Sequence, residues 1–123
     1  MIINDFAVAE MSAPFTLNHY AQAIPLVNPS ENRPADGHPL MTSGYGKYKM
    51  NSNGRPNSAT SRYLLYSPME YVSVSKCKSA WAGQTIDNSV ICADNDAVSI
   101  CSGDSGGPLT IEEDGETRLV VYK

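Results

Sequence analysis

Residues 101–109 read Cys-Ser-Gly-Asp-Ser-Gly-Gly-Pro-Leu, so three glycines and a proline surround Ser105, and an aspartate directly precedes it. Glycine allows backbone angles that other residues avoid, and it lets a second backbone come close. A hydroxyl on such a bend can stand clear of its neighbours while nearby N–H groups point at one spot. Acyl transfer needs this combination, because the nucleophile must be exposed and donors must face the oxygen that becomes negative. On composition alone, a glycine-rich surface turn is the simpler interpretation.

The bulk properties limit the classes of protein to consider. A chain of 123 residues, 41% of them hydrophobic, is one domain or part of one. Its net charge of −4 argues against nucleic acid or an anionic membrane as the main partner. No stretch has the apolar length that spans a bilayer. The opening residues 1–5 lack the pattern of a secretory signal. Three cysteines leave at least one without a partner inside the chain.

The whole string around Ser105 closely resembles the active-serine motif of chymotrypsin-like (trypsin-fold) serine endopeptidases, Gly-Asp-Ser-Gly-Gly-Pro. This resemblance implies that Ser105 is the nucleophile and that the N–H groups of Gly103 and Ser105 form the oxyanion hole. It also implies an all-β fold of two antiparallel β-barrels with the active site between them. We expect residues 1–123 to be a partial domain that supplies the end of the first barrel and most of the second. The N-terminal part with the histidine and the C-terminal strands and helix are expected to be missing.

The start of the chain contains a second candidate catalytic residue. Residues 4–11 begin with Asn-Asp and continue as an apolar, strand-like segment, which by itself indicates an ordinary turn before a strand. The family has its catalytic aspartate in an Asn-Asp-apolar-Ala setting, so the resemblance makes Asp5 the buried carboxylate that orients the histidine. The family's histidine precedes this aspartate, whereas His19 and His38 both follow Asp5. We therefore expect the chain to lack its general base and to be inactive alone.

Two further serines are expected to contact substrate. The residue six positions before the nucleophile is Ser99, where trypsin-type members of the family have an aspartate. A carboxylate there would select Lys or Arg, whereas a neutral serine favours an apolar or aromatic side chain. The resemblance places Ser102 at the entrance of this pocket. The resemblance also implies that Asp104 pairs with the ammonium group of the family's mature N-terminus.

The segments between these motifs read as strands and loops. Residues 21–27 are apolar and extended, and residues 39–46 resemble the family strand that ends in Ser-Gly-Trp-Gly, with Tyr45 in place of the tryptophan. Residues 51–62 have almost nothing to bury and predict an exposed loop. Residues 63–74 predict a strand, and residues 75–81 a short capped helical turn.

The expected pairing of the cysteines comes from the resemblance and not from their spacing. The family joins the two positions that match Cys77 and Cys92, so these two are expected to form a disulfide, while free thiols or metal ligands are the alternatives. The spacing matches no zinc pattern, and no metal is expected. Cys101 is left over. A further family disulfide falls on Leu40 and Ile111, two apolar residues here.

The last segment predicts a hairpin, because Asp114-Gly115 lies between two apolar runs. Taken together, the sequence predicts a secreted, extracellular serine endopeptidase that hydrolyses protein or peptide substrates through a Ser-His-Asp triad, with protein inhibitors as further partners. No organic cofactor is indicated. A non-catalytic protease homologue that acts as a binding or regulatory module is the alternative. A more distant one is a hydrolase with a serine elbow, since residues 103–107 also fit Gly-x-Ser-x-Gly.

Overall fold

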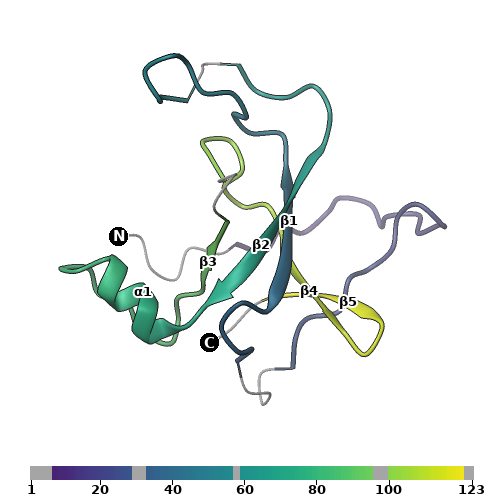
Figure 1. The fold of residues 1–123 in the computed structure, drawn as a ribbon. Helices are drawn as coiled ribbons and strands as arrows, with labels where there is room; N and C mark the ends of the chain where they lie inside the picture. Colours follow the sequence, from purple (N-terminus) through teal and green to yellow (C-terminus); the bar gives the residue numbers. More distant parts are fainter. Residues whose placement is uncertain (1–6, 29–32, 57–58, 96–99, 121–123) are drawn as a thin grey trace.

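A five-stranded antiparallel sheet organises the computed structural model, which describes residues 7–28, 33–56, 59–95 and 100–120 (Figure 1). The elements are β1 (Pro39–Gly44), β2 (Leu65–Val72), α1 (Val74–Ala80), β3 (Cys92–Asp94), β4 (Leu109–Glu113) and β5 (Glu116–Leu119). The strand order is β3-β2-β1-β4-β5. Within the described ranges, α1 is the only helix, so the prediction of a β fold is confirmed.

The central strand β1 carries the core. It pairs with β2 along its whole length and with β4 through three residues, which brings Leu40 directly opposite Ile111. Both side chains are buried, and Val27, Met69 and Tyr71 complete the cluster. The two positions that the resemblance linked by a disulfide thus do face each other, and here an apolar contact joins the strands.

The β4–β5 hairpin has the predicted turn. Glu113 pairs with Glu116, so Asp114 and Gly115 form a two-residue connection. Their φ values are 52° and 77°, as a type I′ turn requires at both central positions. These observations confirm the predicted hairpin. The turn could be predicted because it depends only on the two residues that form it.

Helix α1 begins earlier than predicted. Ser73, and not Ser75, is its N-cap, and the Ser73 hydroxyl accepts a hydrogen bond from the Lys76 N–H group. A disulfide joins Cys77 of α1 to Cys92 of β3, with Cα atoms 6.3 Å apart, which is the pairing that the resemblance implied. Cys101 is a half-buried free thiol.

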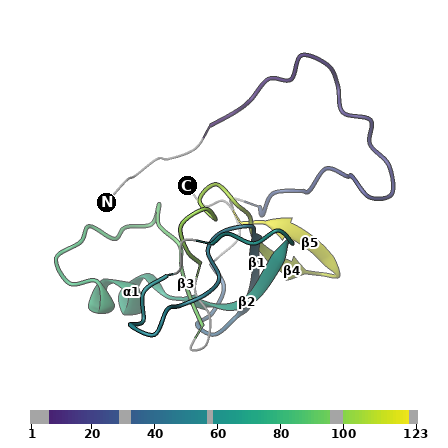
Figure 2. The same ribbon diagram turned by 90° about the horizontal axis from the view of Figure 1, so that it is seen from above.

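The N-terminal segment differs from its prediction. Residues 7–11 form no strand, and Val8 is 92% exposed. Residues 21–27 form isolated bridges and no strand. They bond to the sheet at their end, where Val27 N–H donates to the Leu119 carbonyl at 3.0 Å. Figure 2 shows the earlier part of residues 7–28 running well outside the sheet before the chain returns to it. An apolar run becomes a strand only where a neighbour completes its hydrogen bonds, and the described residues offer none here.

Residues 45–64 form a long loop that connects β1 to β2 and projects beyond the ends of both strands (Figure 1). Isolated bridges pair Lys47 with Thr60 and Met50 with Pro56. The predicted exposure of residues 51–62 is confirmed in their described part, of which only Ser61 is half-buried.

Candidate active site

The loop that carries Ser105 consists of two consecutive turns. Asp104 N–H donates to the Cys101 carbonyl at 3.0 Å, and Gly107 N–H donates to the Asp104 carbonyl at 2.9 Å. Gly103 has φ 101° and Gly106 has φ 83°, so both turns use backbone angles that side chains disfavour. Ser105 lies between these glycines and is exposed. The loop therefore presents its hydroxyl to solvent.

The Asp104 carboxylate anchors this loop to the bend after β1. One oxygen accepts a hydrogen bond from Gly46 N–H at 2.8 Å, and the other accepts one from Cys101 N–H at 3.0 Å. A third link runs from Lys47 N–H to the Ser102 carbonyl at 3.0 Å. These bonds fix the serine loop against an element almost sixty residues earlier in the chain.

The glycines on either side of Tyr45 make this approach possible. A Cβ atom on Gly46 would lie 2.5 Å from the Asp104 carboxylate, and one on Gly44 would overlap it. A Cβ atom on Gly107 would likewise lie 2.8 Å from the Asp104 carbonyl oxygen. From the sequence, Gly44-Tyr45-Gly46 indicated only the end of a strand, and this contact was not predicted. The two glycines flanking one aromatic were the available signal.

The structure describes some of the predicted site residues and not others. Ser102, Gly103 and Ser105 all lie on the exposed side of the loop. For the N–H groups of Gly103 and Ser105, no acceptor is found among the described residues. Asp5 and Ser99 lie outside the described residues.

Neither histidine lies at the serine loop. His38 precedes β1, and its carbonyl accepts a hydrogen bond from Tyr71 N–H. The serine loop packs at the opposite end of β1, near Gly44, roughly 20 Å away at the rise of a strand. His19 packs edge-on against Tyr20, with ring centroids 5.2 Å apart. In the described ranges, no hydrogen bond joins either imidazole to Ser105.

A cavity of about 510 Å³ opens beside the serine loop. Ile100, Cys101 and Asp104 line it from one side, and the base of residues 45–64 and the start of β2 line it from the other. Its walls are largely apolar, with Leu65 and Tyr66 contributed by β2.

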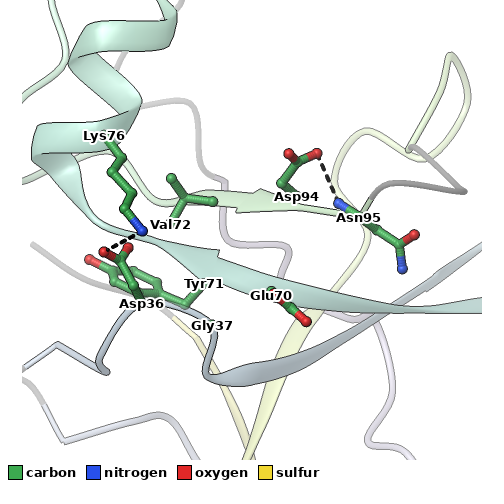
Figure 3. A pocket seen from close by; sticks show the side chains of 8 residues that line it. All are labelled: Asp36, Gly37, Glu70, Tyr71, Val72, Lys76, Asp94 and Asn95. Atoms are coloured by element: carbon green, nitrogen blue, oxygen red, sulfur yellow. Dashed lines mark hydrogen bonds and ion pairs between the residues drawn. The ribbon is translucent and has the colours of Figure 1, made fainter.

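A second pocket, of about 340 Å³, lies at the far end of β2 and is shown in Figure 3. The Asp36 carboxylate accepts a hydrogen bond from Ser73 N–H at 2.6 Å and pairs with the Lys76 ammonium group at 3.0 Å. These contacts, the bond from Ser73 first, lower the pKa of Asp36 below its usual 3.8. Glu70 and Asp94 also line this pocket.

The fold also separates the two kinds of serine hydrolase considered above. A serine elbow lies between a strand and a helix in a sheet of parallel strands. Here the strand β4 follows Ser105, and every strand pair among the described residues is antiparallel. The elbow alternative is therefore excluded.

Comparison with known proteins decides the family. A family model described as Trypsin matches residues 2–120. The chain belongs to the trypsin family. Trypsin alpha of Drosophila erecta is 36% identical over 110 residues, which cover 88% of this chain and 40% of that protein. Trypsin beta of the same species and Trypsin alpha of Drosophila melanogaster are each 34% identical over the same shares.

The chain spans about 40% of the length of these trypsin-family relatives. The antiparallel sheet with one short helix agrees with the chymotrypsin-like β fold of the family. In the described part of the chain, no helix is long and apolar enough to cross a bilayer, and no group of three or more His, Cys, Asp or Glu could hold a metal ion.

Proposed function

We propose that this chain is part of a serine endopeptidase in which Ser105 attacks the peptide carbonyl. The supporting observation is the loop itself, which exposes Ser105 between two positive-φ glycines and is held in place by Asp104. The Ser105 oxygen forms a bond to the carbonyl carbon while its proton passes to a histidine. That proton then moves to the leaving amine as the C–N bond breaks, and water hydrolyses the acyl ester.

The N–H groups of Gly103 and Ser105 would hold the oxyanion during both steps. Both groups lack an acceptor among the described residues, so they remain available for a substrate oxygen. Asp5 would orient the histidine and stabilise its protonated form. The histidine itself would precede Asp5 in a longer protein, because His38 is at the wrong end of β1 and His19 packs on Tyr20.

Ser99 and Ser102 would set the preference for the substrate side chain. The related proteins are named trypsins, but the position six residues before Ser105 is a neutral serine in this chain. Without a carboxylate to pair with Lys or Arg, the pocket would favour apolar or aromatic side chains. The substrates would be proteins or peptides outside the cell, where the Cys77–Cys92 disulfide persists, and protein inhibitors would compete for the same site.

The test uses a fluorophosphonate probe, which labels activated serines. We expect the 123-residue chain to be labelled poorly and to hydrolyse peptide esters very slowly, because a serine without a base is a weak nucleophile. The longer gene product should be labelled at Ser105, and Ser105→Ala should abolish this labelling. Ser79→Ala on α1 serves as the control. Stoichiometric labelling of the short chain would refute the requirement for an added histidine.

The alternative is a non-catalytic homologue that binds other proteins. It is favoured by one observation, that neither histidine of this chain lies at the serine loop. The coding sequence upstream of Met1 separates the two proposals. A segment resembling Thr-Ala-Ala-His-Cys supports the enzyme, whereas a substituted histidine supports the homologue.

A further inference from the structure

Asn53 is followed by Gly54, and this is the only Asn-Gly pair in the sequence. The side-chain carbonyl carbon of an asparagine can be attacked by the backbone nitrogen of the next residue. A Cβ atom on that next residue obstructs the approach, and glycine has none. Asn53 therefore has the neighbour that favours spontaneous deamidation.

Residues 51–55 form a turn that is organised by the side chain of Asn51. Its Oδ1 atom accepts hydrogen bonds from Asn53 N–H at 3.0 Å and from Arg55 N–H at 2.9 Å. The Asn51 N–H group donates to the Arg55 carbonyl at 2.8 Å and closes the turn. The carboxamide of Asn53 makes no hydrogen bond within the described ranges. The turn thus holds one asparagine side chain and leaves the other free.

The reacting groups of this turn are open to solvent. Asn53 and Gly54 are both exposed, and no atom lies within 4 Å of the place that a Cβ atom on Gly54 would take. The turn belongs to residues 45–64, which project beyond the ends of β1 and β2 (Figure 1). Gly54 N–H donates to the Asn51 carbonyl at 3.0 Å, so this bond must open before the nitrogen can attack. An exposed turn opens at little cost in free energy.

We propose that Asn53 is a site of spontaneous deamidation. The Gly54 nitrogen loses its proton to hydroxide and forms a bond to the side-chain carbonyl carbon of Asn53, and the side-chain nitrogen leaves as ammonia. Water then opens the resulting five-membered succinimide. Breaking the new C–N bond gives aspartate, whereas breaking the original peptide C–N bond gives isoaspartate, in which the main chain runs through the side chain.

Either product changes the charge and geometry of the turn. Residues 45–64 contain four Lys and Arg and no Asp or Glu, so the product adds the first carboxylate of this loop. Isoaspartate also lengthens the main chain by one carbon between Asn51 and Arg55, whose mutual hydrogen bonds depend on the present spacing. The reaction needs only water and no step at Ser105, so it goes beyond the proposed peptidase activity.

Asn51 provides a control within the same turn. It is followed by Ser52, whose side chain obstructs the attack, and its own Oδ1 atom is held by two N–H groups. Cleavage after Lys49 and Arg62 releases residues 50–62, in which both asparagines can be compared by fragmentation in a mass spectrometer.

The experiment incubates the folded chain at mildly alkaline pH and follows the mass gain of about 1 Da at each asparagine. We expect Asn53 to react roughly tenfold faster than Asn51, and Gly54→Ala to slow Asn53 roughly tenfold. Gly54 has φ 69°, so alanine there disfavours the turn and would by itself free Asn53. A slower reaction in Gly54→Ala therefore reports the added Cβ atom. An isoaspartyl methyltransferase with a labelled methyl donor should label the aged chain and not aged Asn53→Gln.

Three outcomes would overturn the proposal. These are equal rates at Asn51 and Asn53, an unchanged rate in Gly54→Ala, and a rate at Asn53 that is more than roughly tenfold lower in the folded chain than in urea. The third result would mean that the turn protects the Gly54 nitrogen. Ser105→Ala should deamidate as the original chain does, so failure of the catalytic proposal leaves this result intact. Circular dichroism of each variant checks that the sheet is retained.

Discussion

Asp104 makes the contacts on which the geometry of the serine loop depends. Its two carboxylate oxygens accept N–H groups from the bend after β1 and from the start of its own loop. A carboxylate that accepts two backbone donors aligns both of them, and a hydrogen bond to a charged group is stronger than one between neutral groups. Asp104 thereby fixes the position of the neighbouring Ser105, the proposed nucleophile.

Asp104→Asn should lower the free energy of unfolding by about 1–3 kcal/mol, because the amide nitrogen cannot accept one of the two N–H groups. Urea unfolding measures this loss. Asp114→Asn is the matched control, since Asp114 is exposed in a type I′ turn with φ 52°, where asparagine is equally favourable. Equal losses for the two variants would show that Asp104 is not an anchor.

The lowered pKa of Asp36 predicts that the start of α1 responds to pH. Because Ser73 N–H and Lys76 lower its pKa below 3.8 in the folded chain, its ionised form stabilises the start of α1. This contribution is present above about pH 4 and is lost as the pH falls through the lowered pKa of the folded state. The Ser73 amide resonance should therefore shift below pH 4 in an NMR titration.

Asp36→Asn should remove this shift of the Ser73 amide. Asp87→Asn is the control, because the pKa of Asp87 is also lowered, chiefly by the Ser89 hydroxyl, at a place remote from Ser73 in the sequence. A Ser73 response that survives Asp36→Asn, or that Asp87→Asn removes, would contradict the assignment.

Among the elements, β1 links the hydrophobic core to the serine loop. It pairs with both β2 and β4, buries Leu40 against Ile111, and ends at Gly44. Gly44 and Gly46 leave the space that the Asp104 carboxylate occupies. A change in the pairing of β1 would therefore move the serine loop as well.

The pair of Leu40 and Ile111 gives a direct test of this register. In the double variant Leu40→Cys/Ile111→Cys, the two thiols face each other across β1 and β4 and should form a second disulfide on oxidation. The bond closes a loop of about 70 residues, and the chain-entropy model gives it roughly 4 kcal/mol. Thiol counting and urea unfolding of the oxidised and reduced forms measure both effects.

Each single cysteine variant is the control for the lost core side chain. It should be less stable than the original chain, and oxidation of the monomer should not restore the lost stability. Three free thiols persisting in the double variant after oxidation, one of them Cys101, would show that β1 and β4 do not pair in this register.

The elements that the sequence predicted well are those with local causes. The Asp114-Gly115 turn and the capped helix α1 follow from nearby residues, and the start of α1 was misplaced only because Ser73 and Ser75 can both act as caps. The serine loop was recognised from its motif. Its contact with Gly44 and Gly46 joins positions almost sixty residues apart and could not be read from spacing. The prediction of a strand over residues 4–11 was wrong in their described part, because strand formation depends on a partner that is distant in the sequence.

On the scale of the whole molecule, the surface is divided into regions of different character. Residues 45–64, which contain four Lys and Arg and no Asp or Glu, connect one end of β1 to β2. The pocket lined by Asp36, Glu70 and Asp94 lies at the other end of β2. Residues 7–28 form a third region, in which Val8, Phe15 and Tyr20 are 92%, 73% and 94% exposed. The side chains of these three residues are therefore not covered by the rest of the described chain.

This segment is fixed to the sheet at its C-terminal end only. Val27 is 2% exposed and belongs to the core, and its N–H group donates to Leu119 of β5. Val27→Ala should therefore lower the free energy of unfolding by roughly 1–3 kcal/mol. Val8→Ala makes the same change in the same segment at an exposed site and should alter it by less than about 0.5 kcal/mol.

Urea unfolding compares the two valine variants, and hydrogen exchange adds a measurement without mutation. The Val27 amide should exchange slowly, whereas most amides of residues 7–17 should exchange near the rate of an unfolded peptide, because no hydrogen bond holds them among the described residues. Phe15→Ser should reduce the binding of a hydrophobic dye and leave the free energy of unfolding unchanged. Comparable losses of stability from Val8→Ala and Val27→Ala would mean that the whole segment, and not only its C-terminal end, packs on the sheet.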